Sequence, residues 1–130
     1  MNIRRFLWYW GPPVILMVVI FLLSSRQRIS VSTVYSINFL VFKSLHVLEY
    51  ALLYFLLFRA YYNSMSRKNM KKIFGIALAT TILYALSDEL HQTGVPTRNG
   101  ALRDIFIDSL GILLCFQYTK VYLSNLKHLL

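Results

Sequence analysis

The chain has little negative charge and almost no cysteine. Only 5 of its 130 residues are aspartate or glutamate, against 14 lysines and arginines, so the formal net charge is +9. The single cysteine, Cys115, cannot form an internal disulfide or a zinc site made of several cysteines. The sequence also contains no internal repeat and no low-complexity segment. Cysteine usage therefore leaves the redox compartment open.

Apolar residues are abundant. They make up 57% of the chain, and the mean hydropathy is +0.53. A water-soluble domain of this length does not need so apolar a composition. Because a membrane span takes about 20 apolar residues, four spans with short loops use up the chain. The sequence predicts an all-α membrane protein, a bundle of four transmembrane helices forming one domain over residues 1–130.

The four predicted spans cover about residues 7–25, 39–58, 73–90 and 102–123. The first contains no charged residue from Phe6 to Ser25. This run is too long for the apolar part of a typical signal peptide, so we interpret it as an uncleaved anchor. Pro12 and Pro13 lie near its start and are expected to shape the entrance of the helix.

Positive charge lies between the predicted spans and not on a soluble face, which indicates membrane topology and not nucleic-acid binding. Most basic residues fall in segments that share one side if the helices alternate in direction. The positive-inside rule assigns that side to the cytoplasm, together with both termini. The basic residues of this side are Arg4, Arg5, Arg59, Arg67, Lys68, Lys71, Lys72, Lys120 and Lys127.

Ionisable residues within the predicted spans lie near the opposite, extracytoplasmic side. At about 100° per residue, Lys43, His46 and Glu49 fall in one sector of a helix and can face the bundle interior together. A carboxylate in the membrane is expensive unless it is paired or hydrated. We therefore predict a polar pocket at this side. Its candidate residues are Lys43, His46, Glu49, Asp88, Glu89, Gln92, Arg98, Asp104 and Asp108.

The last predicted span combines acids with small residues. Asp104 and Asp108 are four positions apart and share one helix face. Gly111 and Cys115 continue that face as a narrow strip. We expect another helix to approach closely along this strip, because small side chains let helix backbones come together.

A segment rich in turn formers joins the last two predicted spans. Residues 93–100 contain two glycines and a proline and are too short for a helix, so they predict a tight loop over the polar pocket. Arg98 in this loop, with Lys43 and Arg103, supplies positive charge for the acids. The alternative for Lys43 and Arg103 is that they only extend from helix ends to the membrane interface.

The polar residues also follow one another in a distinctive order. They read Ser24-Ser25, Lys43-x-x-His46-x-x-Glu49-Tyr50, Asp88-Glu89-x-x-Gln92, Pro96-x-Arg98 and Asp104-x-x-x-Asp108-x-x-Gly111. This series resembles the VanZ-like family of small bacterial integral membrane proteins. The family takes its name from a protein associated with low-level teicoplanin resistance. The resemblance implies a multi-pass protein of the bacterial cytoplasmic membrane, with a role in the cell envelope and in antibiotic resistance.

Relatives depart from this chain at two positions. Asparagine often stands where this chain has Asp108, which implies a hydrogen-bonding role there, and glycine is common at the position of Cys115. Three functions remain open. The pocket binds an envelope lipid or a phosphate-bearing, lipid-linked precursor; or His46 and nearby acids form a membrane enzyme; or the acids serve an ion-coupled transporter.

Partners and cofactors follow from the same features. The expected partners are membrane lipids and not nucleic acid. No cofactor and no metal are expected, since the sequence has no HExxH, GxSxG or P-loop motif.

Overall fold

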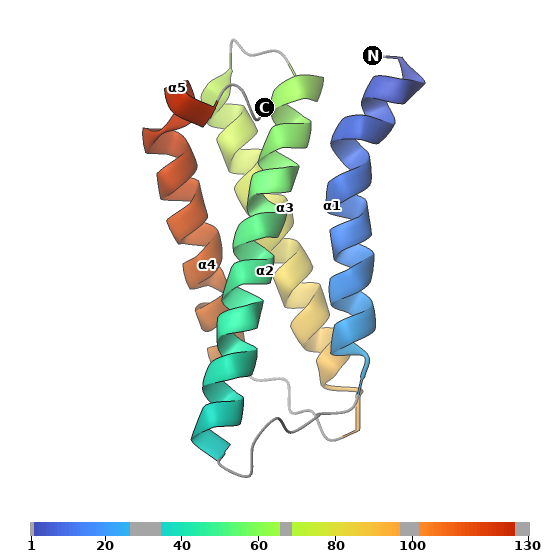
Figure 1. The fold of residues 1–130 in the computed structure, drawn as a ribbon, viewed down its shortest axis with the longest axis vertical. Helices are drawn as coiled ribbons and strands as arrows, with labels where there is room; N and C mark the ends of the chain where they lie inside the picture. Colours follow the sequence, from blue (N-terminus) through green and yellow to red (C-terminus); the bar gives the residue numbers. More distant parts are fainter. Residues whose placement is uncertain (1, 27–34, 66–68, 97–101, 127–130) are drawn as a thin grey trace.

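A computed structural model describes residues 2–26, 35–65, 69–96 and 102–126. The described residues form helices and short connections and contain no strand, so the all-α prediction is confirmed (Figure 1). The helices are α1 (Ile3–Ser24), α2 (Tyr35–Ser64), α3 (Met70–Gln92), α4 (Leu102–Val121) and the short α5 (Leu123–Leu126).

Three of these helices are long and apolar enough to cross a membrane. They are α1, the part of α2 from Ser36 to Ser64, and α3. The helix α4 is not among them, because its 20 residues carry Arg103, Asp104, Asp108 and Lys120. The described residues thus contain three candidate spans, and the fourth stays a prediction that depends on how α4 hides its charges.

The helices extend beyond the apolar stretches of the sequence. The 30 residues of α2 extend about 45 Å at about 1.5 Å per residue, which is more than the roughly 30 Å of bilayer hydrocarbon. Asparagine caps set two of the starts. The Asn2 side chain accepts a hydrogen bond from the Arg5 backbone N–H, and Asn69 accepts one from Lys72, each at 3.1 Å.

Pro12 and Pro13 are therefore inside α1 and not at its entrance, so that expectation was wrong. The reason is the Asn2 cap, which starts the helix at Ile3, well before the apolar run. Proline inside a helix removes a backbone hydrogen bond and tends to bend the axis. Figure 1 shows the first turns of α1 leaning away from the other helices.

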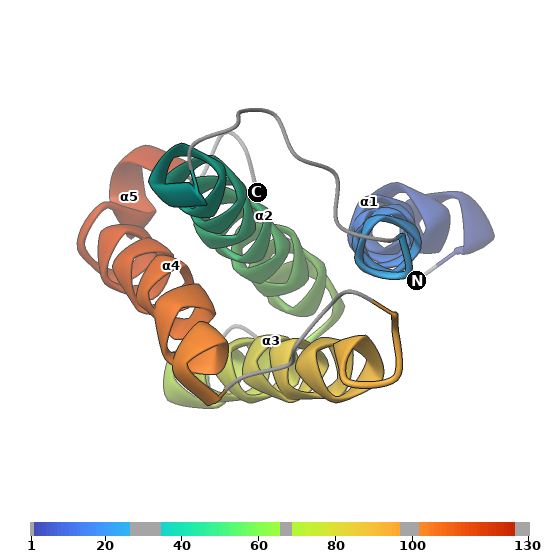
Figure 2. The same cartoon turned by 90° about the horizontal axis from the view of Figure 1, so that it is seen from below.

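The helix α2 is the centre of the bundle. It packs against α1, α3 and α4, whereas α1 and α4 make no contact within the described residues. Figure 2 shows α1 standing apart on one side, with α4 on the other. Aromatic rings fill the space among α2, α3 and α4. Phe58 packs on Phe74 with ring centroids 4.7 Å apart, and Phe116 packs edge-on against Phe74 at 5.8 Å and against Tyr54 at 6.1 Å.

Gly111 brings α4 very close to α2. A Cβ atom at this position would lie 2.2 Å from the carbonyl oxygen of Val47, which is backbone and cannot rotate away. Only glycine fits this crossing without moving a helix. The close approach expected from the small-residue strip is thus confirmed at Gly111.

Large apolar side chains cover the outside of all four long helices. Ile15 is 65% exposed, Leu48 65%, Leu83 63% and Leu114 68%. So many exposed aliphatic side chains are unfavourable in water and favourable in lipid. The apolar exterior therefore supports a membrane protein. Exposed apolar side chains also cover one face of α4.

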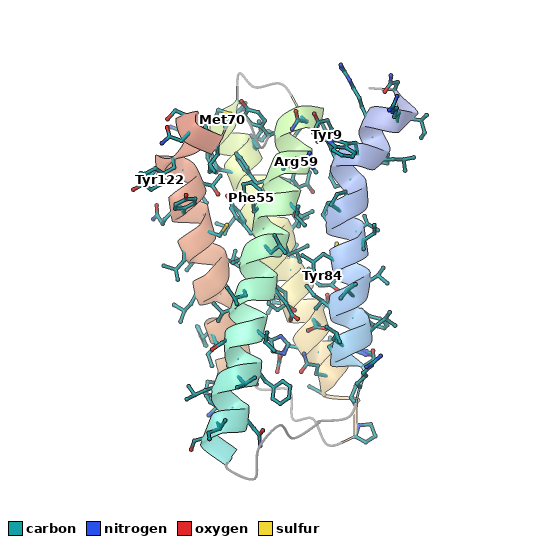
Figure 3. All side chains as sticks on the ribbon, viewed as in Figure 1. Tyr9, Phe55, Arg59, Met70, Tyr84 and Tyr122 are labelled. Carbon is teal, nitrogen blue, oxygen red and sulfur yellow. The ribbon has the colours of Figure 1, made fainter. Side chains whose placement is uncertain are left out.

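The two ends of the bundle differ in charge. The starts of α1 and α3 and the last turns of α2 and α4 lie at one end, which we call the basic end (Figure 1). Figure 3 shows Tyr9, Arg59, Met70 and Tyr122 at this end. The other end, which we call the acidic end, holds the start of α4 and the last turns of α3. The described charged residues of the basic end are Arg4, Arg5, Arg59, Lys71, Lys72 and Lys120.

Candidate functional site

Asp88 is the centre of a hydrogen-bond network at the acidic end. Its carboxylate is only 4% exposed and accepts three side-chain hydrogen bonds. Ser24 donates at 2.5 Å and Tyr50 at 3.0 Å, from α1 and α2 respectively. Gln92, one turn along α3, donates at 2.9 Å. Bonds to a carboxylate are stronger than neutral ones, so Asp88 fastens three helices together.

Three further contacts join α1 and its C-cap to α3 near this network. Ser25 and the Nε2 atom of His91 lie 3.0 Å apart, and the His91 ring packs on Phe21 with centroids 4.6 Å apart. One turn before Asp88, the Tyr84 hydroxyl donates to the backbone carbonyl of Met17 at 2.6 Å. The end of α1 is therefore positioned by polar contacts as well as by packing.

An ion pair joins α2 to α4. The ammonium nitrogen of Lys43 lies 2.7 Å from Oδ2 of Asp104, and the side chains are 15% and 10% exposed. Arg103 reaches the other oxygen of Asp104 at 3.6 Å, while its guanidinium lies over the Phe39 ring at 5.1 Å. Lys43 therefore has a carboxylate partner inside the bundle.

Asp108 is the most buried acid of α4, at 2% exposure. It interacts electrostatically with Lys43, but also with Glu89, Asp104 and Asp88. Its Oδ1 atom is buried and has no hydrogen-bond partner among the described residues, and the same holds for Oδ1 of Asp104. Buried acceptors without a donor are rare in folded proteins. These two oxygens can accept hydrogen bonds from a further group.

The remaining candidates lie close by. His46 Nδ1 is 3.6 Å from Glu49 Oε2, and the His46 ring stacks on Tyr50 at 6.3 Å. Glu89 is buried at 5% exposure. Arg98 lies outside the described residues. No group of three metal-binding side chains occurs in the part of the chain that the structure describes.

Of the predicted loop, residues 93–96 are described. Turn hydrogen bonds start it, from the Gly94 N–H to the His91 carbonyl at 3.0 Å and from the Val95 N–H to the Gln92 carbonyl at 3.1 Å. These bonds continue directly from the end of α3. The remainder of the predicted loop, residues 97–100, lies outside the described residues.

The structure shows two polar groups at the acidic end. One is the network around Asp88, and the other is the ion pair of Lys43 with Asp104, next to Asp108. The candidate residues did not include Ser24 and Tyr50, which bond to Asp88, because neutral hydroxyls give no charge signal in an apolar span. The signal that could have identified them is that both belong to the ordered series of polar residues that resembles the VanZ-like family.

The ion pair gives a testable prediction. Replacing Lys43 by methionine should lower the free energy of unfolding by about 3 kcal/mol, because Asp104 keeps a poorly hydrated charge without its partner. The double variant Lys43→Met with Asp104→Leu should recover part of this loss, since an apolar pair replaces the ion pair, while Asp108 still loses its favourable interaction with Lys43. Thermal unfolding in detergent measures both. A double variant less stable than Lys43→Met alone would contradict the assignment of a buried pair.

Comparison with known proteins gives one family. A family model described as VanZ/LLP1 matches residues 9–123. The matched segment includes the Asp88 network, the ion pair and Asp108. No curated protein and no solved structure matches the chain.

Proposed function

Because the chain belongs to the VanZ/LLP1 family, we propose that the acidic end faces the extracytoplasmic side of the bacterial cytoplasmic membrane and forms a polar pocket there. In this proposal α4 is the fourth span and both termini are cytoplasmic. The pocket binds the head group of an envelope lipid or of a lipid-linked cell-wall precursor. By holding such a lipid, the protein alters susceptibility to glycopeptides such as teicoplanin.

The buried Oδ1 atom of Asp108 carries this proposal. It is an acceptor without a donor among the described residues. Oδ1 of Asp104, one turn earlier in α4, also accepts no hydrogen bond, although the Arg103 side chain lies 3.6 Å from it. A hydroxyl or ammonium group of a lipid head group supplies the missing donors. In this proposal Lys43 does not contact the lipid. It pairs with Asp104 and so lowers the cost of a negative charge in this part of the membrane.

The apolar exterior supports a lipid as the ligand. Leu110 of α4 is 57% exposed, Phe106 is 74% exposed, and Leu48 of α2 is 65% exposed. An acyl or prenyl chain can lie against such a surface while the head group reaches the acids. A small soluble ligand would not use these side chains.

Lipid retention on the purified protein tests the proposal. The probes are phosphatidylglycerol, with two head-group hydroxyls, phosphatidylethanolamine, with an ammonium that carries N–H donors, and phosphatidylcholine, whose quaternary ammonium carries no donor. Native mass spectrometry should show tighter retention of the first two. Asp108→Leu should weaken it by at least about tenfold, the effect of losing hydrogen bonds to a charged group.

The neighbouring residue provides a matched control. Ser109 is half-buried on another face of α4, so Ser109→Ala should retain lipid as the unaltered protein does. Equal lipid retention by Asp108→Leu and Ser109→Ala would show that Asp108 does not belong to the binding site. Equal retention of all three lipids would show that the pocket does not recognise donors.

A membrane enzyme is the second candidate, because the geometry of His46 favours it. Glu49 Oε2 lies 3.6 Å from His46 Nδ1, just beyond hydrogen-bond distance. A slightly closer approach would let the carboxylate orient the ring to accept a proton from a reacting group. Incubation of the purified protein with the same lipids distinguishes the two functions. A product lost in His46→Ala would favour the enzyme, and unchanged lipids favour binding.

A further inference from the structure

The basic end contains a second feature that the proposed pocket does not use. A hollow of about 480 Å³ opens beside the first turns of α1. Trp8, one of its walls, is 67% exposed, so the hollow is reachable from outside the protein. Its lining residues are Asn2, Arg4, Arg5, Trp8 and Tyr9.

An arginine of α2 holds the aromatic wall of this hollow. The Arg59 guanidinium lies 4.9 Å from the centroid of the Tyr9 ring and 5.9 Å from that of Trp8. Its Nη1 atom lies 3.5 Å from the Trp8 backbone carbonyl oxygen. These contacts connect the leaning start of α1 to the end of α2 and place a further positive charge against the aromatic wall of the hollow.

The positive charge of the hollow is not balanced locally. Arg4 and Arg5 form no ion pair within the described residues. At the acidic end the situation differs, since both Lys43 and Arg103 have Asp104 as a partner. The two arginines of the hollow are thus available to an anion.

The chemistry of the lining identifies that anion. Guanidinium groups bind phosphate oxygens through paired hydrogen bonds. Tryptophan and tyrosine prefer the depth of lipid head groups, and basic residues beside a membrane attract anionic lipids. We propose that the hollow binds the phosphate of an anionic phospholipid in the leaflet at the basic end, through Arg4 and Arg5. This site is independent of the pocket around Asp108.

Two tryptophans make the site observable. The chain has only two, and Trp8 lines the hollow while Trp10 donates to the Ser64 hydroxyl at 2.9 Å. In vesicles of phosphatidylcholine with added phosphatidylglycerol brominated near its head group, quenching of Trp8 reports binding. Trp10→Phe serves as the background so that Trp8 alone emits. Brominated phosphatidylcholine is the uncharged comparison.

The double variant Arg4→Gln with Arg5→Gln should bind brominated phosphatidylglycerol about tenfold more weakly, as measured by the lipid concentration that half-quenches Trp8. Lys71→Gln with Lys72→Gln is the matched control, because it removes the same charge from exposed residues at the same end. The control should keep most of the affinity. Equal losses in the two double variants would overturn the site and leave only general attraction by charge.

The source of the phosphate is tested in the same assay. Millimolar inorganic phosphate should displace little of the brominated phosphatidylglycerol if a lipid is the ligand. Full displacement would assign the hollow to a soluble phosphate compound and overturn the lipid assignment. Asp108→Leu should leave the quenching unchanged, so failure here and failure of the proposed pocket can be told apart.

Discussion

Replacing Gly111 by leucine should separate α4 from α2 and prevent the bundle from reaching its native packing. Alanine already places a Cβ atom 2.2 Å from the carbonyl oxygen of Val47. Overpacking of this kind lowers the free energy of unfolding by about 1–3 kcal/mol. We expect Gly111→Ala to lie at the upper end of that range, because the obstacle is backbone, and Gly111→Leu to exceed it. Unfolding in detergent and the amount of protein in membranes measure the two effects.

Gly75 provides the control for this prediction. It lies in α3, and a Cβ atom there would have nothing within 4 Å. Gly75→Ala should therefore keep or raise stability, because alanine is favoured over glycine in a helix by about 1 kcal/mol. If Gly111→Ala were as stable as Gly75→Ala, α4 would not cross α2 at the distance described here.

Removing the carboxylate of Asp88 should release α1 from the bundle. Asp88→Ala removes the acceptor to which the Tyr50 hydroxyl and the Gln92 amide donate, whereas the Ser24 hydroxyl keeps the Phe21 carbonyl oxygen, 3.0 Å away, as an alternative acceptor. A buried donor left unsatisfied costs about 1–3 kcal/mol, and three inter-residue bonds are lost together, so the combined loss should be about 2–4 kcal/mol after relaxation. Proteolysis of α1 and loss of thermal stability are the measurements, and both should change together.

A neighbouring serine and a double-mutant cycle refine this test. Ser87 is exposed and bonds only to its own helix, at the carbonyl of Tyr84, so Ser87→Ala should have little effect. Ser24→Ala should cost less in the background of Asp88→Ala than in the unaltered protein, by a coupling of about 1–3 kcal/mol. Additive losses would show that Ser24 and Asp88 do not interact.

Much of the fold could be predicted from the sequence, because apolar runs separated by basic segments indicate helices in a membrane. Helix ends were less predictable. Asn2 and Asn69 start helices before the apolar runs begin, which moved Pro12 into a helix interior. The fourth span remains a prediction, because the charged residues of α4 are tolerable in a membrane only if the bundle shields them.

The candidate site could be predicted as a location but not as a network. Asp88 and Gln92 are four positions apart in the sequence, which puts them on one face of a helix, and in α3 they bond to each other. Spacing within a helix cannot say which residue of another helix lies opposite. The bond from Ser24 to Asp88 and the pairing of Lys43 with Asp104 depend on helix crossings, and these are set by packing such as that at Gly111.

The absence of contact between α1 and α4 has a consequence for biosynthesis. Synthesis proceeds from the N-terminus onward, so α1 is made before α2 and α3, which are its partners within the described residues. Asp88, which anchors the end of α1, is made 64 residues after Ser24. In the proposed membrane arrangement, α1 therefore lies in the lipid without its partners until α2 and α3 have been made. The absence of charged residues after its first turn makes that state tolerable.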